Sequence, residues 1–182
     1  MGAPPSVEAL PTGTGADRER SHYLPAAARW LSPVKGGDTM TVKSILSGKG
    51  RDVLTIEPNA KLETAITMLA EHRIGALVVL GPERRVIGIL SERDIVRVLA
   101  QRGAAALSEP LAQVMTRKVS TCCEQDTVSA LMEQMTAGKF RHIPVLDQDR
   151  LIGIISIGDV VKHRLGEMER ESAALRDYIQ TA

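Results

Sequence analysis

The feature that most constrains this chain is a segment that occurs twice. Val86–Asp94 reads Val-Ile-Gly-Ile-Leu-Ser-Glu-Arg-Asp, and Leu151–Asp159 reads Leu-Ile-Gly-Ile-Ile-Ser-Ile-Gly-Asp. Each copy is an apolar run typical of a strand, interrupted by one glycine and followed by Ser-x-x-Asp at the start of a helical pattern. Because a duplicated unit commonly builds its sites where the copies meet, we expect the function to lie at that seam.

The duplication extends well beyond these nine residues. Val53 matches Val119 at an offset of 66, and Asp94 matches Asp159 at an offset of 65 after a one-residue gap. This period is longer than the roughly 20–50 residues of solenoid repeats, so it indicates a tandem pair of small units. We divide the chain into a disordered N-terminal segment (1–39), a first repeat (40–105), a second repeat (106–166) and a C-terminal helix extension (167–182).

The N-terminal segment carries no usable pattern. Prolines and glycines interrupt every period within residues 1–39, which predicts disorder. Patterned sequence begins near Met40, so either Met1 or Met40 fits as the natural start.

Composition and charge narrow the class of partner. The 182 residues carry 23 basic and 22 acidic groups, a net charge of +1, which gives no reason to expect nucleic acid or an anionic membrane as partner. No apolar run reaches the roughly 18–20 residues of a membrane span, and no secretory signal is readable. The two cysteines, Cys122 and Cys123, are adjacent, which predicts reduced thiols in a cytoplasmic protein rather than a disulfide or a zinc site.

Periodicity predicts the same order of elements in both repeats. Helices alternate with short strands, so the fold class is α/β or α+β. In the first repeat we expect strands at 53–56, 76–80 and 86–90, a helix with its apolar face from Leu62 to Ala70, and a helix from Ser91 to Gly103. In the second we expect strands near 119–121, 142–146 and 151–155, and a helix carrying Val128, Leu131, Met132 and Met135.

The last helix continues past the second repeat with a 4-3 spacing of apolar residues. That spacing resembles a coiled-coil seam with one polar interruption. Packing against its own repeat and pairing with a second chain both remain open at this point. The seam positions are Val161, Leu165, Met168, Ser172, Leu175 and Ile179.

The two Ser-x-x-Asp motifs have a structural and a functional interpretation. Ser91 and Ser156 at helix N-caps, with Asp94 and Asp159 three residues later, resemble capping boxes. The functional interpretation is compatible with capping, because a helix N-terminus also attracts phosphate and a carboxylate can accept from the two hydroxyls of a ribose.

A second group of polar residues is present in only one repeat. Arg141 and His142 precede a predicted strand, where the first repeat has Gly75 and Ala76. A plain surface loop is one interpretation, and a phosphate clamp beside a capped helix is the other. Any two sites should therefore bind unequally, with Arg93 as a source of positive charge in the first.

No catalytic set is recognisable. Neither Ser91 nor Ser156 has a histidine at a readable spacing, and no nucleophile elbow, Walker loop or dinucleotide-binding glycine motif occurs. We therefore expect a protein without enzymatic activity, catalytic cofactor or metal.

Taken together, the two Gly-Ile-(Leu/Ile)-Ser-x-x-Asp motifs, Phe-Arg-His-Ile-Pro-Val at 140–145 and the Val-x-Thr that opens each repeat resemble the CBS domain, the regulatory module named after cystathionine β-synthase. The chain is similar to small bacterial proteins made of a single CBS pair. The resemblance implies tandem β-α-β-β-α repeats packed as a pseudo-twofold pair, and a homodimer.

The resemblance also implies a ligand and the residues that hold it. CBS pairs commonly bind adenosine-containing ligands: AMP, ADP, ATP, S-adenosylmethionine or NAD(H). By that analogy Asp94 and Asp159 would hold ribose hydroxyls, and Ser91, Ser156, Arg141 and His142 would hold phosphate. The base or ribose would approach Thr55, Ile56, Thr121 and Cys122, and the adenine slots would be lined by Ile74, Ala76, Ile143 and Pro144.

Two hypotheses for the function follow. The first is a cytoplasmic, dimeric sensor of energy or redox state that binds an adenine nucleotide and acts on an unidentified protein target. The alternative is a dimeric interaction scaffold that binds no nucleotide, in which Ser-x-x-Asp only caps helices.

Overall fold

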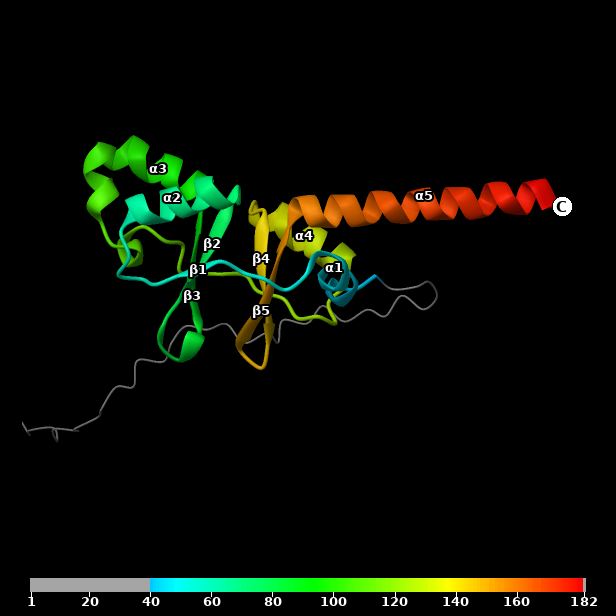
Figure 1. Cartoon of the computed structure of the whole chain (residues 1–182), viewed down its shortest axis with the longest axis horizontal. Coiled ribbons are helices and arrows are strands. Elements are labelled where there is room, and N and C mark those ends of the chain that lie inside the picture. Colours follow the sequence, from blue (N-terminus) through cyan, green and yellow to red (C-terminus); the bar gives the residue numbers. More distant parts are fainter. Residues whose placement is uncertain (1–39, 182) are drawn as a thin grey trace, which may run out of the picture. The chain divides into compact units, whose positions relative to one another are not determined.

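The strands form two separate small sheets, one in each repeat (Figure 1). The computed structural model describes residues 40–181, so the disorder expected for residues 1–39 lies outside the described part. In the first sheet, β1 (Thr55–Ile56) runs parallel to β2 (Ala76–Leu80), and β2 pairs antiparallel with β3 (Val86–Ser91). In the second, β4 (His142–Asp147) and β5 (Arg150–Ser156) form an antiparallel hairpin.

Helices alternate with these strands, which confirms the mixed α/β class. Local signals set several of their ends: Ser91 caps α3 and Gly103 ends it, as the sequence predicts. The helix α2 ends instead at Arg73, which adopts a left-handed conformation with φ of 52°. The helices are α1 (Val42–Lys49), α2 (Leu62–His72), α3 (Glu92–Arg102), α4 (Val128–Gly138) and α5 (Ile157–Thr181).

The strand expected near residues 119–121 does not form, so that prediction is wrong. A single parallel bridge joins Cys122 to Val145 where the first repeat has the two-residue β1. The position that would pair with Thr121 is Pro144, the equivalent of Val78 in β2. Because proline has no N–H, it cannot donate the next bond of the ladder.

Each repeat completes its core with the opening segment of the other repeat. Val42, Ile45 and Leu46 of α1 are buried in the core of the second repeat. Leu111 and Met115, in the opening segment of the second repeat, are buried in the core of the first. The two repeats are therefore interlocked through exchanged segments.

The glycines of the duplicated motif receive these exchanged segments. A β-carbon at Gly153 in β5 would lie 2.8 Å from Cδ2 of Leu46, and one at Gly88 in β3 would clash with the side chain of Met115. Glycine at both positions is thus explained by close approach of a side chain from the exchanged segment.

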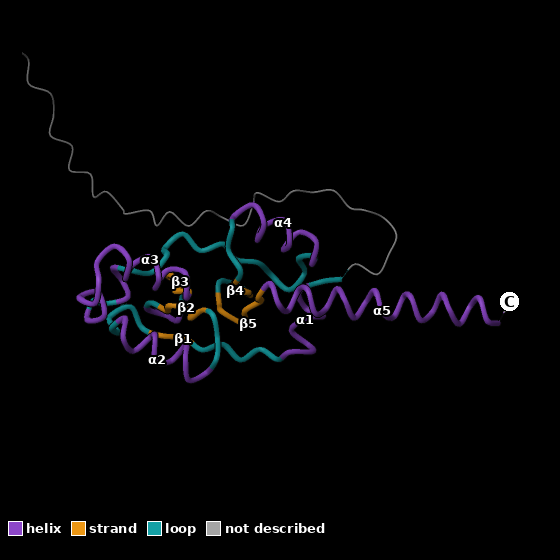
Figure 2. The backbone as a smooth tube through the Cα atoms, turned by 90° about the horizontal axis from the view of Figure 1, so that it is seen from above, coloured by secondary structure: helices purple, strands orange, loops and turns teal. Residues whose placement is uncertain are grey.

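The helix α5 starts against β5, α1 and α4, and its later turns extend beyond the rest of the second repeat (Figures 1 and 2). No helix within residues 40–181 combines the length and the apolar character that a bilayer span requires.

Candidate functional site

Both Ser-x-x-Asp motifs lie at the same end of their hairpins. In β2–β3 the register places Ala76 opposite Ser91, and in β4–β5 it places His142 opposite Ser156. We call the surroundings of Ser91 and Asp94 site 1. Site 2 comprises the surroundings of Ser156 and Asp159, with Arg141 and His142.

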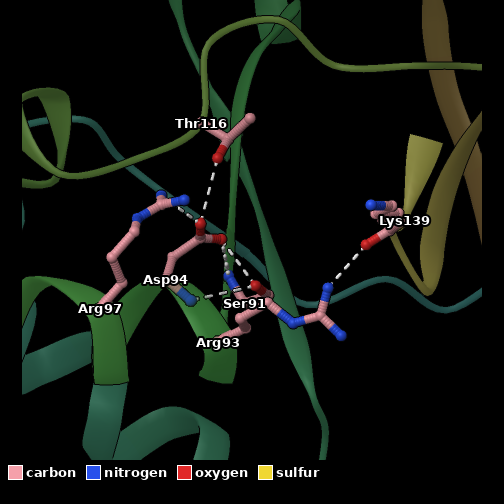
Figure 3. A network of polar contacts seen from close by, with 6 residues as sticks. All are labelled: Ser91, Arg93, Asp94, Arg97, Thr116 and Lys139. Carbon is pink, nitrogen blue, oxygen red and sulfur yellow. Dashed lines mark hydrogen bonds and ion pairs between the residues drawn. The ribbon is translucent and has the colours of Figure 1, made fainter.

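In site 1, Asp94 is enclosed by donors from its own chain (Figure 3). Its Oδ2 accepts from the backbone N–H of Ser91 at 3.0 Å and from the Ser91 hydroxyl at 2.6 Å. Its Oδ1 accepts from Nη2 of Arg97 at 2.6 Å and from the hydroxyl of Thr116 at 3.2 Å. Both carboxylate oxygens are therefore engaged, and only 7% of the residue is exposed.

In site 2, Asp159 makes the same capping contacts but has a different cation. Its Oδ2 accepts from the N–H and the hydroxyl of Ser156, each at 2.7 Å, and from Nζ of Lys49 at 2.7 Å. Within residues 40–181 no donor reaches Oδ1, and the side chain is 23% exposed. The second carboxylate thus keeps one oxygen available for a hydroxyl group.

The charge state of Asp159 follows from these contacts. Burial by itself would raise its pKa, but the hydrogen bonds from Lys49 and Ser156 outweigh burial, and the pKa lies below its ordinary value of 3.8. Asp159 is therefore an ionised acceptor at neutral pH.

The missing side chain at Gly75 is explained by His142. A β-carbon at Gly75 would lie 3.0 Å from Cε1 and 3.3 Å from Nε2 of His142, and 3.5 Å from Oε2 of Glu92. The imidazole of the second repeat therefore rests against the backbone of the first, at the seam. The first repeat has Gly75 and Ala76 where the second has Arg141 and His142. A single imidazole therefore lies at the seam, and no second large side chain collides with it.

Burial is also the main influence on the titration of His142. It lowers the pKa of the imidazole below 6.5, whereas the nearby carboxylates of Asp159 and Glu92 act in the opposite direction. Lys49 and Arg141 lower it further. A neutral imidazole is favoured in this state, and an added anion would favour its protonated form.

The two arginines expected near phosphate have different surroundings. Nη1 of Arg93 donates to the backbone carbonyl of Lys139 at 2.6 Å, so it ties α3 to the end of α4. Arg141 is exposed, and its guanidinium has no hydrogen-bond or ion-pair partner within residues 40–181. Arg141 is therefore available to an anion, whereas Arg93 is committed to holding the repeats together.

The other predicted site residues do not share one open cavity. Thr55 and Ile56 line a hollow of about 780 Å³ that also includes Leu80 and Pro82. That hollow lies at the far end of the β2–β3 hairpin, because Leu80 pairs with Val86 whereas Ala76 pairs with Ser91.

The residues expected to approach the base or ribose, or to line the adenine slots, differ in burial. Ile143 is fully buried and Cys122 is 7% exposed, both in the core of the second repeat. Ala76 and Pro144 are also buried, while Ile74 and Thr121 are partly exposed. Ile74 and Thr121 are therefore the more accessible side chains of this group.

Neither cysteine thiol is activated for reaction. Cys122 and Cys123 are free, and burial raises the pKa of both thiols, which disfavours the reactive thiolate. No group of three histidine, cysteine or acidic side chains within residues 40–181 is placed to hold a metal ion.

Sequence reasoning missed two residues that contact the aspartates. Thr116 reaches Asp94 and Lys49 reaches Asp159, and both come from the exchanged segments. At an offset of 66, Lys49 is one position from the equivalent of Thr116. The repeat could have shown that these two segments correspond, but not that each crosses to the other repeat.

Comparison with known proteins gives consistent matches. A family model described as CBS domain matches residues 42–101 and 111–166. The mitochondrial CBS domain-containing protein CBSX3 of Arabidopsis thaliana is 31% identical over 153 residues, which cover 80% of this chain and 74% of that protein.

Solved structures give the same picture. The CBS-domain containing protein ATU1752 from Agrobacterium tumefaciens has a TM-score of 0.68 and 45% identity, covering 73% of this chain and 99% of that chain. The CBS domain pair of protein MJ0100, in complex with 5′-methylthioadenosine and S-adenosyl-L-methionine, has a TM-score of 0.64 and 26% identity, covering 71% of this chain and 99% of its own.

Proposed function

The chain belongs to the CBS domain family, and from this premise we propose that it is a regulatory module without catalytic activity, which binds an adenosine-containing nucleotide at site 2. The observation that carries the proposal is the open oxygen of Asp159 in the same site as the unpaired guanidinium of Arg141 and the titratable imidazole of His142. The ligand class is an adenine nucleotide such as AMP, ADP or ATP, or NAD(H).

The ribose has an acceptor in this arrangement. Oδ1 of Asp159 can accept from one ribose hydroxyl, and the second hydroxyl can share Oδ2 or replace Lys49 there. The side chain of Lys49 is flexible and 30% exposed, so moving its ammonium group from Asp159 toward a phosphate requires little free energy. The ligand would then replace the ion pair between Lys49 and Asp159.

The phosphate has donors on the adjacent strand. Arg141 is free to form charge-assisted hydrogen bonds, and His142 gains a proton more readily once an anion is near. The N-terminus of α5 supplies further positive potential at Ser156. Thr121, Cys122, Ile143 and Pro144 would shape the base slot, mainly through their backbone.

Site 1 is proposed as the weaker site. Asp94 has both oxygens occupied, and its repeat offers Gly75 and Ala76 where site 2 has a guanidinium and an imidazole. Ile74, Ala76 and Ser91 would contact a ligand there only after Arg97 or Thr116 releases Asp94. Thr55 and Ile56 would contact a ligand from the hollow at the other end of the β2–β3 hairpin.

The complex of MJ0100 with two adenosine derivatives supports the ligand class, because that domain pair is similar to this chain over 71% of its length. We further propose a homodimer in the cytoplasm that reports energy or redox state to a protein target. The free, buried thiol of Cys122 suits a reducing compartment.

The test begins with the native protein. Mass spectrometry of small molecules released from purified protein should detect an adenine nucleotide, and calorimetry with AMP, ATP, NADH and S-adenosylmethionine should rank them. A chain that releases nothing and binds none of the four would contradict the proposal and favour the nucleotide-independent scaffold.

A further inference from the structure

An apolar stripe runs along α5 and is not covered by the second repeat. Leu165 is 55% exposed, Met168 57% and Ile179 73%. The same stripe includes Val161, which is 46% exposed, and by sequence position Ser172 and Leu175. Isolated apolar side chains on a surface need no explanation, but a stripe in regular succession marks a contact surface.

This stripe is not the face by which α5 packs on its own chain. The first turns of α5 bury Val160 completely, and Nε2 of His163 lies 3.2 Å from the hydroxyl of Ser44 in α1. At 3.6 residues per turn, His163 is about 200° around the helix from Val161. Packing against its own repeat therefore leaves the stripe available to another partner.

The spacing assigns a heptad register to the helix. The stripe alternates d and a positions, and the flanking e and g positions are almost all charged. In this register the d positions are Val161, Met168 and Leu175, the a positions are Leu165, Ser172 and Ile179, the e positions are Lys162, Glu169 and Arg176, and the g positions are Arg164, Glu171 and Tyr178.

The flanking charges match a second copy in parallel orientation. In a parallel pair, each g position faces the e position five residues later on the other helix. Arg164 then faces Glu169 of the second copy, and Glu171 faces Arg176. The twofold axis repeats both pairs, so four opposite-charge contacts flank the seam.

The antiparallel register that overlaps most of the stripe brings like charges together. Setting Leu165 against Leu175 and Met168 against Ser172 places Glu169 beside Glu169 of the second copy, and Glu171 beside Glu171. Lys162 then faces Arg176. Like charges across a seam are unfavourable, which disfavours this register. The other antiparallel register, with Leu165 against Met168, brings opposite charges together but sets Leu175 opposite Gly158 and Ile179 beyond the start of the partner helix, so only the parallel pair covers the whole stripe.

We propose that α5 pairs with α5 of a second copy as a short, parallel, in-register two-stranded coiled coil. Ser172 faces its own equivalent at the centre, where its hydroxyl can find a partner. Because α5 begins at site 2, this pairing sets the two copies of site 2 at the same end of the coiled coil. The inference deepens the homodimer proposed above and rests on no property of the nucleotide.

Cysteine crosslinking tests the orientation. In a Cys123→Ser background, Ser172→Cys should form a disulfide-linked dimer on mild oxidation, since the two positions meet across a parallel seam. Ala174→Cys is the matched control, because Ala174 is exposed on the same helix at an outer position. If both variants crosslink equally, or neither does, the parallel seam is overturned.

Charge exchange tests the recognition. Glu169→Lys with Glu171→Lys in one chain, and Arg164→Glu with Arg176→Glu in another, should each raise the dimer dissociation constant by on the order of tenfold or more. Mixing the two variants should restore association by sedimentation, and circular dichroism checks that each remains folded.

The outcomes separate this inference from the dimer itself. If the dimer dissociation constant is unchanged by the charge variants and Ser172→Cys does not crosslink, the two copies pair through other helices. That result overturns the coiled coil but not the dimer. A native chain that sediments at its monomer mass of 19.7 kDa at micromolar concentration overturns both.

Discussion

Asp94 and Asp159 occupy equivalent places in the two repeats, yet one is sealed and the other is open. Both accept from the serine that caps their helix. Asp94 gives its second oxygen to Arg97 and Thr116, whereas Asp159 keeps one oxygen free of donors within residues 40–181. The same local motif therefore serves structure in the first repeat and remains able to serve binding in the second.

The comparison predicts different losses of stability, which is the largest effect we expect. Asp94→Ala removes a buried acceptor and leaves the donors of Ser91, Arg97 and Thr116 without a partner. The free energy of unfolding should therefore fall by on the order of 2–3 kcal/mol. Asp159→Ala loses mainly a cap and a partly exposed ion pair, and should cost about 1 kcal/mol. Urea unfolding of both variants measures the difference, and equal losses would show that the sealed carboxylate has no special role.

Ligand affinity should show the opposite order. Asp159→Ala should weaken binding of AMP by about tenfold to a hundredfold, because hydrogen bonds to a charged acceptor contribute about 1.5–3 kcal/mol. Asp94→Asn, which keeps the shape and most of the acceptors at site 1, is the matched control and should change affinity far less. Calorimetry on folded protein decides, and unchanged affinity in Asp159→Ala would remove site 2 from consideration.

The contact across the seam predicts a smaller effect. Gly75→Ala pushes against His142 and should cost about 1 kcal/mol in unfolding free energy. In a His142→Ala background the same change should cost nothing, because the colliding ring is gone. Gly48→Ala is the control for adding a methyl group, since Gly48 lies in α1 with open space around it. A cost that persists without the imidazole would place its cause elsewhere.

The smallest effect is a pH dependence. His142 has a lowered pKa in the folded chain, so folding excludes a proton that the unfolded chain binds below about pH 6.5. Stability should therefore be full above pH 6.5 and decline as the pH falls toward the folded pKa. Urea unfolding at pH 7.5 and 5.5 measures it.

His142→Gln should flatten the decline between those two pH values, whereas His72→Gln, at an exposed position on α2, should leave it in place. The contribution of Asp159 has a separate window. Because its pKa is lowered in the folded chain, Asp159 stabilises the fold above about pH 3.8, and this stabilisation is lost only as the pH drops further. A decline that His142→Gln leaves unchanged would assign the titration to another group.

Sequence reasoning succeeded where the cause is local. The start of α3 at Ser91 and its end at Gly103 follow from capping contacts within a few residues, and both could be predicted. The hairpin strands followed from apolar runs bounded by turns. The strand near residues 119–121 failed because its stability depended on Pro144, a partner more than twenty residues away.

The site was predictable only in part for the same reason. Ser156 and Asp159 could be identified because they are three residues apart, but Lys49 reaches Asp159 from 110 residues away. No pattern along the chain reveals that α1 crosses to the other repeat. The role of Gly75 was likewise hidden, because its meaning depends on the imidazole of His142 across the seam.

The exchanged segments also set an order of events during synthesis. The core of the first repeat closes only when Leu111 and Met115 have emerged, soon after α3. Leu46 must wait for β5 and Val160, so at roughly 5–20 residues per second the apolar face of α1 stays without its native partners for several seconds. The growing chain thus carries an exposed apolar helix face through most of its translation, and this face is open to non-native contacts during that time.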